Sequence, residues 1–138
     1  MTGTRTLVIC KPDAVRRGLA GEIVGRLESR GLRLVAAELR LIDRETASRH
    51  YAEHQGKPFY GDLVEFITRS PSLVLVVEGV EDTWRVVRAM MGPTNPLDAP
   101  PGTIRGDFGL ELTENLVHGS DSAESATREI EVFFPDLS

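Results

Sequence analysis

Hydrophobic residues are grouped in short runs that are separated by glycine, proline and charged residues. The continuous apolar runs at residues 4–10 (TRTLVIC) and 72–78 (SLVLVVE) predict buried strands, and the second is hydrophobic enough to be central. A looser alternation at residues 32–42 predicts another strand. Residues 110–117 bring the chain back into the sheet, and this last strand is predicted to end at His118.

Between the strands, apolar residues recur at the spacing of amphipathic helices. Asp43 is predicted to cap one of these helices, and Asp121 to cap the last one, with Glu124 completing a capping box. Gly119 is expected to allow a tight turn before that helix. The predicted helices span residues 21–30, 44–54, 62–68, 81–91 and 122–131.

The order of elements is β-α-β, a helical insertion, β-α-β and a final helix. This order predicts an α/β (α+β) fold, the ferredoxin-like split β-α-β arrangement, with a four-stranded antiparallel sheet and helices packed on it. Alternating strands and helices also fit a small doubly wound parallel sheet. The 138 residues contain no repeat or linker, so residues 1–138 are predicted to form a single domain.

Composition excludes several classes of protein. With 41% hydrophobic and 27% charged residues, the chain can form a core and is not disordered. The net charge of −5 disfavours a general nucleic-acid binder. No apolar run approaches the roughly 20 residues of a membrane span, and no N-terminal signal segment is seen, so a cytoplasmic protein without membrane contact is expected. The one cysteine, Cys10, lies in an apolar run and is predicted to be buried.

The most informative stretch is residues 115–122 (NLVHGSDS). It places His118 at a strand end beside the start of a helix, whose free N–H groups attract anions. A neutral imidazole next to a phosphate site can accept a phosphoryl group. Taken alone, the stretch favours a histidine that only completes an edge strand, because single histidines are weak signals.

Other polar residues strengthen the chemical interpretation. The Pro-rich stretch 92–109 is predicted to lack regular structure, and such long loops inside a compact domain are usually functional. Cations and small polar donors near His118 would form a phosphate site, because phosphoryl transfer depends mainly on positioning and on neutralising oxygen charge. The candidates are Lys11, Arg88, Thr94, Arg105 and Asn115.

A competing hypothesis comes from His50-Tyr51-Ala52-Glu53-His54, which matches the H-x-x-E-H motif of inverted zinc proteases. On a helix, histidines four residues apart share a face and could bind one metal ion. A zinc-dependent hydrolase using His50, Glu53 and His54 is therefore an alternative. The chain has neither a P-loop nor a Rossmann fingerprint.

Four motifs together resemble the nucleoside diphosphate kinase family. They are KPD at residues 11–13, TNP at 94–96, PGTIRGDF at 101–108 and NLVHGSDS at 115–122. The resemblance covers essentially the whole chain, and its short tail is similar to that of bacterial members. It implies transfer of the γ-phosphate of a nucleoside triphosphate to a nucleoside diphosphate by a ping-pong mechanism.

The resemblance also implies a role for individual residues. His118 matches the histidine that becomes phosphohistidine, and Glu129 matches the carboxylate that holds the imidazole by its far nitrogen. Tyr51 and Ser120 match supporting residues around this histidine. The residues that match substrate-binding positions are Arg88, Thr94 and Arg105 for the phosphates, Lys11 and Asn115 for the sugar and phosphate region, and Phe59 and Leu112 for the two faces of the base.

Metal and partners follow from the same resemblance. Mg²⁺ is expected to arrive with the nucleotide phosphates, and Asp121 is the protein group expected near it, through water. The expected ligands are nucleoside di- and triphosphates. Family members form homo-oligomers, tetramers or hexamers, and the sequence does not choose between them. A catalytically silent nucleotide-binding scaffold is a further alternative.

Overall fold

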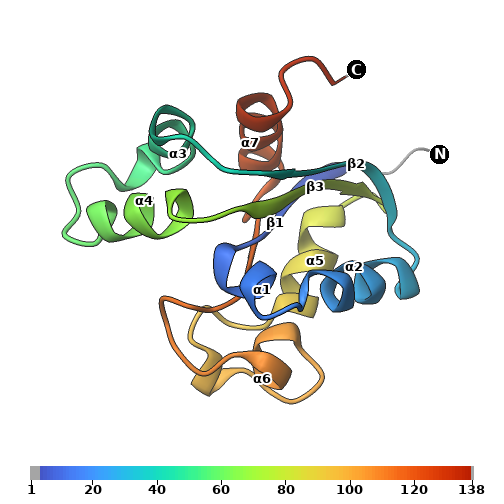
Figure 1. Cartoon of the computed structure of the whole chain (residues 1–138). Helices are drawn as coiled ribbons and strands as arrows, with labels where there is room; N and C mark the ends of the chain where they lie inside the picture. The colour runs from blue at the N-terminus through green and yellow to red at the C-terminus, as the bar shows by residue number, and fades with distance from the viewer. Residues whose placement is uncertain (1–3, 138) are drawn as a thin grey trace.

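The computed structural model describes residues 4–137 and contains one antiparallel sheet of four strands (Figure 1). The strands are β1 (Arg5–Cys10), β2 (Arg33–Arg40), β3 (Ser72–Glu78) and β4 (Val117–Gly119), in the spatial order β2-β3-β1-β4. Residues 1–3 and 138, which the single-domain prediction includes, lie outside the described part. Strand β3 is an inner strand, as its continuous apolar run predicts.

The strand order is that of a split β-α-β fold. β3 lies between β1 and β2 and is antiparallel to both, and β1 lies between β3 and β4 in the same way. Each β-α-β unit therefore has a strand of the other unit inserted between its own two strands, which confirms the predicted fold class and excludes a parallel sheet. The α-helices are α1 (Pro12–Arg16), α2 (Ala20–Ser29), α3 (Arg44–His50), α4 (Tyr60–Thr68), α5 (Thr83–Met91), α6 (Ile104–Phe108) and α7 (Ala123–Phe133).

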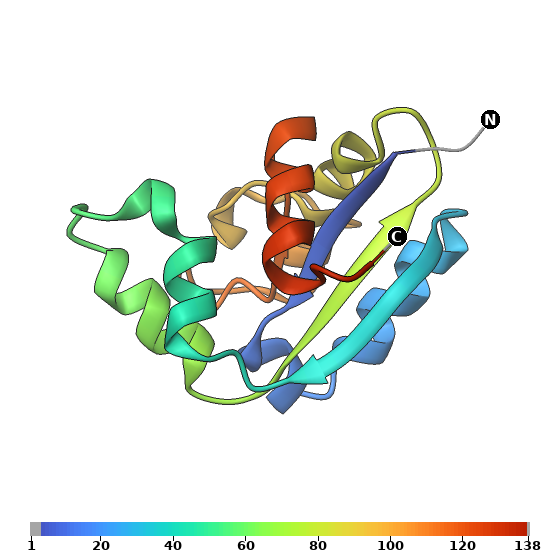
Figure 2. The ribbon, with the colours of Figure 1, turned by 90° about the horizontal axis from the view of Figure 1, so that it is seen from above.

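Helices cover both faces of the sheet, α7 on one side and α1, α2 and α5 on the other (Figures 1 and 2). Because successive side chains of a strand point to opposite faces, β1 contributes Val8 and Cys10 to one core and Leu7 and Ile9 to the other. All four of these side chains are fully buried. This double burial explains why β1 and β3 appear in the sequence as continuous apolar runs instead of alternating ones.

Helices α3 and α4, joined by the 3₁₀ turn η1 (Ala52–His54), extend beyond the end of the sheet (Figure 1). The Asp43 side chain accepts a hydrogen bond from the Thr46 N–H, as predicted for the cap of α3. The predicted helix at residues 44–54 ends earlier, at His50. No helix in residues 4–137 is both long and apolar enough to cross a membrane.

The Pro-rich stretch has more structure than predicted. It contains the 3₁₀ turn η2 (Pro96–Asp98) and helix α6, which is capped by the Thr103 hydroxyl accepting from the Gly106 N–H. A Cβ at Gly106 would lie 2.0 Å from the Pro100 carbonyl oxygen, so only glycine fits where the loop folds back on itself. Local capping and one close contact thus fix a segment that lacks helical periodicity.

The C-terminal third also differs from the prediction in detail. Strand β4 is only three residues long, and residues 110–116 contain no strand. Gly119 makes no turn: it pairs with Val8 inside the sheet. The cap of α7 is Ser122, whose side chain accepts from the Ser125 N–H, and not Asp121. Aspartate and serine are both favoured caps, so the sequence pattern alone cannot decide which of the neighbours Asp121 and Ser122 caps the helix.

Candidate active site

One cavity of about 550 Å³ opens where β4, α3, α5 and the Pro-rich stretch meet. The predicted site residues come from all parts of the chain, and the fold brings eleven of them to this cavity: Lys11, Tyr51, Phe59, Arg88, Thr94, Arg105, Leu112, Asn115, His118, Asp121 and Glu129. The twelfth, Ser120, lies behind the wall and contacts Glu129. Their predicted roles still require experiment.

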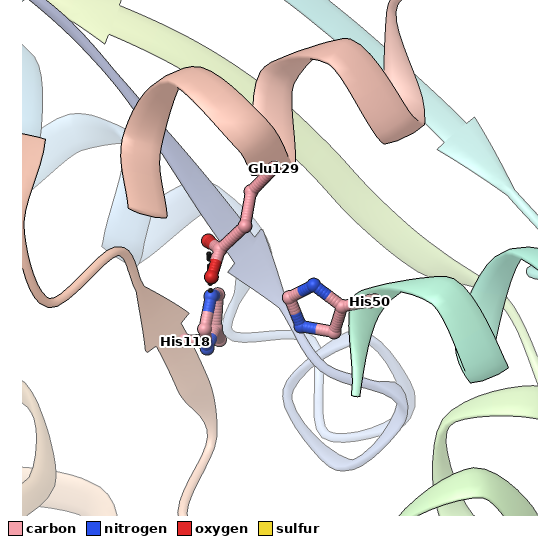
Figure 3. Close-up of side chains that lie close together, drawn as sticks. All are labelled: His50, His118 and Glu129. Carbon is pink, nitrogen blue, oxygen red and sulfur yellow. Dashed lines mark hydrogen bonds and ion pairs between the residues drawn. The ribbon is translucent and has the colours of Figure 1, made fainter. Parts of the chain in front are cut away.

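His118 is held from behind by Glu129, which lies on α7 (Figure 3). The His118 Nε2 and the Glu129 Oε1 are 2.8 Å apart, and the Ser120 hydroxyl donates to the same oxygen at 2.8 Å. The His118 side chain is 24% exposed, whereas that of Glu129 is 6% exposed. The imidazole is therefore fixed by a buried acceptor while its second nitrogen, Nδ1, lies on the side away from Glu129 (Figure 3).

Glu129 remains ionised although it is buried. Burial alone would raise the pKa of its carboxyl group, but the hydrogen bond from His118, the charge of the neighbouring histidines and the Ser120 hydroxyl together lower that pKa to about 2. An ionised carboxylate can only accept hydrogen bonds, so Nε2 must carry the proton that it donates to Glu129. The neutral imidazole therefore has its free lone pair on Nδ1.

Lys11, Asn115 and Thr94 form a hydrogen-bonded chain across the cavity wall. The Lys11 Nζ donates to the Asn115 Oδ1 at 2.8 Å, and the Asn115 Nδ2 donates to the Thr94 carbonyl at 2.9 Å. Burial, followed in size by the opposing charge effects of Asp13 and Arg105, lowers the pKa of Lys11 to about 8. Lys11 is therefore a cation at neutral pH, and it donates both to Asn115 and to the Thr113 carbonyl.

The guanidinium of Arg105 is buried and tied to the backbone. Its Nε donates to the Asn115 carbonyl at 3.1 Å, and its terminal nitrogens donate to the carbonyls of Gly92 and Val117. Burial first, and the nearby Arg88 second, lower the pKa of Arg105 to about 10. Arg88 is half-buried and donates to the Gly119 carbonyl at 3.2 Å. Since arginine has five N–H donors, both side chains keep donors for an anion in the cavity.

Phe59 and Leu112 are large apolar side chains at the rim, and they are 46% and 59% exposed. Exposed apolar groups beside a polar cavity suit a planar ring that inserts between them. Asp121 is exposed on the same rim. The cavity therefore has large apolar side chains at its rim and cations in its interior.

Asp13 supports the site and is absent from the predicted residues. Its buried Oδ2 accepts the Leu116 N–H at 3.0 Å, and Leu116 has φ +76°, a conformation that a branched buried residue rarely adopts. This bond holds the backbone that carries Asn115 on one side and His118 on the other. In the sequence, Asp13 stands out only as part of the KPD motif. Its hydrogen bond to Leu116 could not be predicted, because the two residues are far apart in the chain.

His50 is the second residue whose place the sequence does not predict. Its ring centroid is 4.6 Å from that of His118, edge-on, and it is 4% exposed. Burial and the charge of His118 lower the pKa of His50 to about 3, so it is neutral. Because α3 ends at His50, the two histidines of the zinc motif do not share one helix face: His54 contacts Phe59 instead, at a centroid distance of 5.4 Å.

An oriented imidazole and several cations around one cavity are what a phosphoryl-transfer site requires. Comparison with known proteins agrees with that class. The family model described as nucleoside diphosphate kinase matches residues 4–138. The chain therefore belongs to the nucleoside diphosphate kinase family, and it is a phosphotransferase with nucleoside diphosphate kinase activity.

Similarity to individual proteins extends over the full chain. It is 58% identical over 134 residues to a nucleoside diphosphate kinase of Saccharopolyspora erythraea, covering 96% of this chain and 98% of that one. It is 55% identical over 138 residues to one of Parafrankia sp., covering 100% of both chains. A solved structure of the Halobacterium salinarum nucleoside diphosphate kinase in complex with CDP matches with a TM-score of 0.93 at 51% identity, covering 97% of this chain and 89% of that one.

Proposed function

We propose that the enzyme acts through a phosphohistidine formed on Nδ1 of His118. The observation that carries this proposal is the 2.8 Å hydrogen bond between Nε2 and Glu129, which leaves Nδ1 as the nucleophile. Nδ1 attacks the γ-phosphorus of a nucleoside triphosphate, the N–P bond forms, and the bond to the bridging oxygen breaks. The nucleoside diphosphate leaves, and a second one takes the phosphoryl group by the reverse step.

Glu129 stabilises the phosphorylated His118 by its negative charge. When Nδ1 becomes bonded to phosphorus, the ring holds its proton on Nε2 and carries positive charge, which the ionised Glu129 offsets. Ser120 limits the movement of the same carboxylate by its 2.8 Å hydrogen bond. Tyr51, which is buried beside His50, fills the wall behind the two rings.

The cations bind and neutralise the phosphates. Arg88 has donors free to turn toward the cavity, Arg105 adds a fixed positive charge, and Thr94 lines the same cavity. Lys11 and Asn115, which are hydrogen-bonded to each other, bind the sugar hydroxyl and phosphate region.

The base stacks between Phe59 and Leu112. Stacking recognises a ring face and not a hydrogen-bonding pattern, so we expect wide tolerance of different bases. The complex of the Halobacterium salinarum relative with CDP supports a pyrimidine nucleotide as one ligand of this fold.

Mg²⁺ fits the donors that are present. It needs few protein ligands when phosphate oxygens supply the others, and the exposed carboxylate of Asp121 is at the rim of the cavity. When bound, Mg²⁺ would neutralise phosphate charge; Asp121 would hold it through water. A homo-oligomer of four or six chains, a single domain and a cytoplasmic location stay predictions.

Labelled ATP tests the proposal. After incubation with γ-labelled ATP, we expect an acid-labile, alkali-stable phosphoenzyme that passes its label to added CDP or GDP. His118→Ala should abolish the label. His54→Ala is the matched control, because it removes a histidine from the same cavity, and it should keep the label.

The same experiment also checks the two alternatives that the sequence alone left open. A silent scaffold would bind nucleotide without becoming labelled. A zinc hydrolase would lose its activity in His54→Ala and release inorganic phosphate without transfer to CDP. Label that survives in His118→Ala would reject the assignment.

A further inference from the structure

The wall behind His118 contains a histidine with no explained purpose. His50 is 4% exposed, and neither of its ring nitrogens has a hydrogen-bond partner within residues 4–137. Leaving a buried polar atom unpaired costs about 1–3 kcal/mol, so such atoms usually meet a water molecule or a ligand. Figure 3 shows His50, from α3, beside the contact between His118 and Glu129.

These three side chains form a ligand set. One ligand atom each from His50, His118 and Glu129 lies within 4.8 Å of the others. Two imidazoles and one glutamate are the set that holds zinc in several enzymes, with the fourth position left open. An ion with ligand bonds of about 2.0–2.2 Å needs ligand atoms roughly 3.3 Å apart, so small rotations of these side chains would complete the site.

We propose that a borderline-soft divalent cation, Zn²⁺ being the representative, binds His50, Nε2 of His118 and Glu129, and holds the enzyme in a form that cannot accept a phosphoryl group. The site differs from that of Mg²⁺, which prefers oxygen ligands and arrives with the nucleotide. It also differs from the H-x-x-E-H motif, with which it shares only His50.

The inhibition follows from the tautomer of His118, and this step rests on the proposed role of Nδ1. In the free enzyme, Nε2 carries the ring proton and donates it to Glu129. A metal ion at Nε2 takes the lone pair of that nitrogen, so the proton of the neutral ring moves to Nδ1. Nδ1 then has no lone pair with which to attack phosphorus.

Direct metal binding is the first test. Protein without a histidine tag is titrated with Zn²⁺ alone, without nucleotide, by calorimetry or by competition with a chromophoric chelator. We expect one strong site per chain, and at least a tenfold weaker Kd in His50→Phe and in Glu129→Gln. His54→Gln should bind as the wild type does, since only the H-x-x-E-H set would need it.

Phosphoenzyme formation is the second test. The free Zn²⁺ concentration is set by a zinc buffer and corrected for the zinc that the nucleotide binds. Zn²⁺ should then lower the initial labelling rate of the wild type at least tenfold. The labelling rate of His50→Phe should stay within twofold of its own zinc-free value. His50→Gln repeats the measurement in case the larger ring of phenylalanine disturbs folding, and thermal unfolding checks both variants.

These experiments distinguish failure of the metal site from failure of the proposed phosphohistidine. Equal Kd values in the wild type and both His50 variants would overturn the site. Tight binding that His50→Phe weakens, with labelling unaffected by Zn²⁺, would overturn the inhibition. Absence of any label in the zinc-free wild type would reject the phosphohistidine, and the titration would still report on the metal site.

Discussion

His118 and Glu129 are joined by a 2.8 Å hydrogen bond that connects β4 to α7, eleven residues apart in sequence. Between the two residues lie the end of β4, the Ser122 cap and more than one turn of α7, so the bond is made only when β4 and α7 pack against β1. The orientation of the nucleophile thus depends directly on the tertiary fold.

Replacing Glu129 by glutamine should lower kcat about 10- to 100-fold, as for other carboxylates that orient a histidine, with a small change in KM. Glutamine has a similar volume and can still accept from Nε2, but it cannot offset the charge of the phosphorylated ring. Steady-state kinetics with two nucleotides measure both constants. Ser120→Ala, which removes one hydrogen bond to the same oxygen, should have a smaller effect, and an equal loss in both variants would contradict the charge argument.

The inner strands were predictable because their positions are encoded locally. The predicted strand at residues 72–78 coincides with β3, since burial on both faces leaves an uninterrupted apolar run. The short β4 was not predictable in this way. Its start depends on Leu116 at φ +76°, and the hydrogen bond that stabilises this conformation comes from Asp13, which is 103 positions away in the chain.

In the candidate site too, residues in local motifs were predictable, and residues placed by tertiary contacts were not. Residues in dense motifs, such as Asn115 and His118, were found because the motif itself carries the resemblance. His50 appeared only in a metal motif that the fold does not form, since the end of α3 turns His50 toward His118 and leaves His54 beside Phe59. Most of the stability of a helix in a protein comes from tertiary packing, so local sequence alone does not fix where a helix ends.

Burial of His50 should make stability depend on pH. The pKa of His50 is lowered to about 3, first by burial and then by the charge of His118. Between about pH 6.5 and 3 the unfolded chain binds a proton at this residue that the folded chain does not, so stability is full above pH 6.5 and falls as the pH decreases. The slope is up to about 1.4 kcal/mol per pH unit.

Denaturant unfolding from pH 7 to 5, above the range in which Glu129 titrates, measures this slope. His50→Phe should flatten it, because phenylalanine takes up no proton. An unchanged slope in the variant would assign the pH dependence to other groups.

Substrate affinity should fall at alkaline pH through Lys11. Because burial lowers the pKa of Lys11 to about 8, this side chain loses its charge as the pH rises through that value. The KM for nucleoside diphosphate should then rise, by at most about tenfold per pH unit. Lys11→Arg keeps its charge, and Arg105, with a pKa of about 10, also stays charged below pH 9, so the KM of this variant should be flat from pH 7 to 9 whatever its absolute value. A flat wild-type profile would contradict the assignment.

A side chain at position 119 should destabilise the fold because of its packing against α5. A Cβ there would lie 2.6 Å from the Met91 Sδ and 3.0 Å from the Val87 Cγ1, so these side chains of α5 would have to shift. We expect Gly119→Ala to lower the free energy of unfolding by about 1–3 kcal/mol. Gly61→Ala is the control, since a Cβ at Gly61 meets nothing within 4 Å and should change stability by at most about 1 kcal/mol.

A double-mutant cycle with Met91 identifies the clash. Met91→Ala alone should cost about 2–5 kcal/mol, because Met91 is fully buried in the core between α5 and the sheet. If the Met91 side chain is what excludes a methyl group at position 119, the double variant should lose less than the sum of the two single losses, by at least about 0.5 kcal/mol. Strict additivity in denaturant unfolding would instead assign the cost to Val87 or to the strand itself.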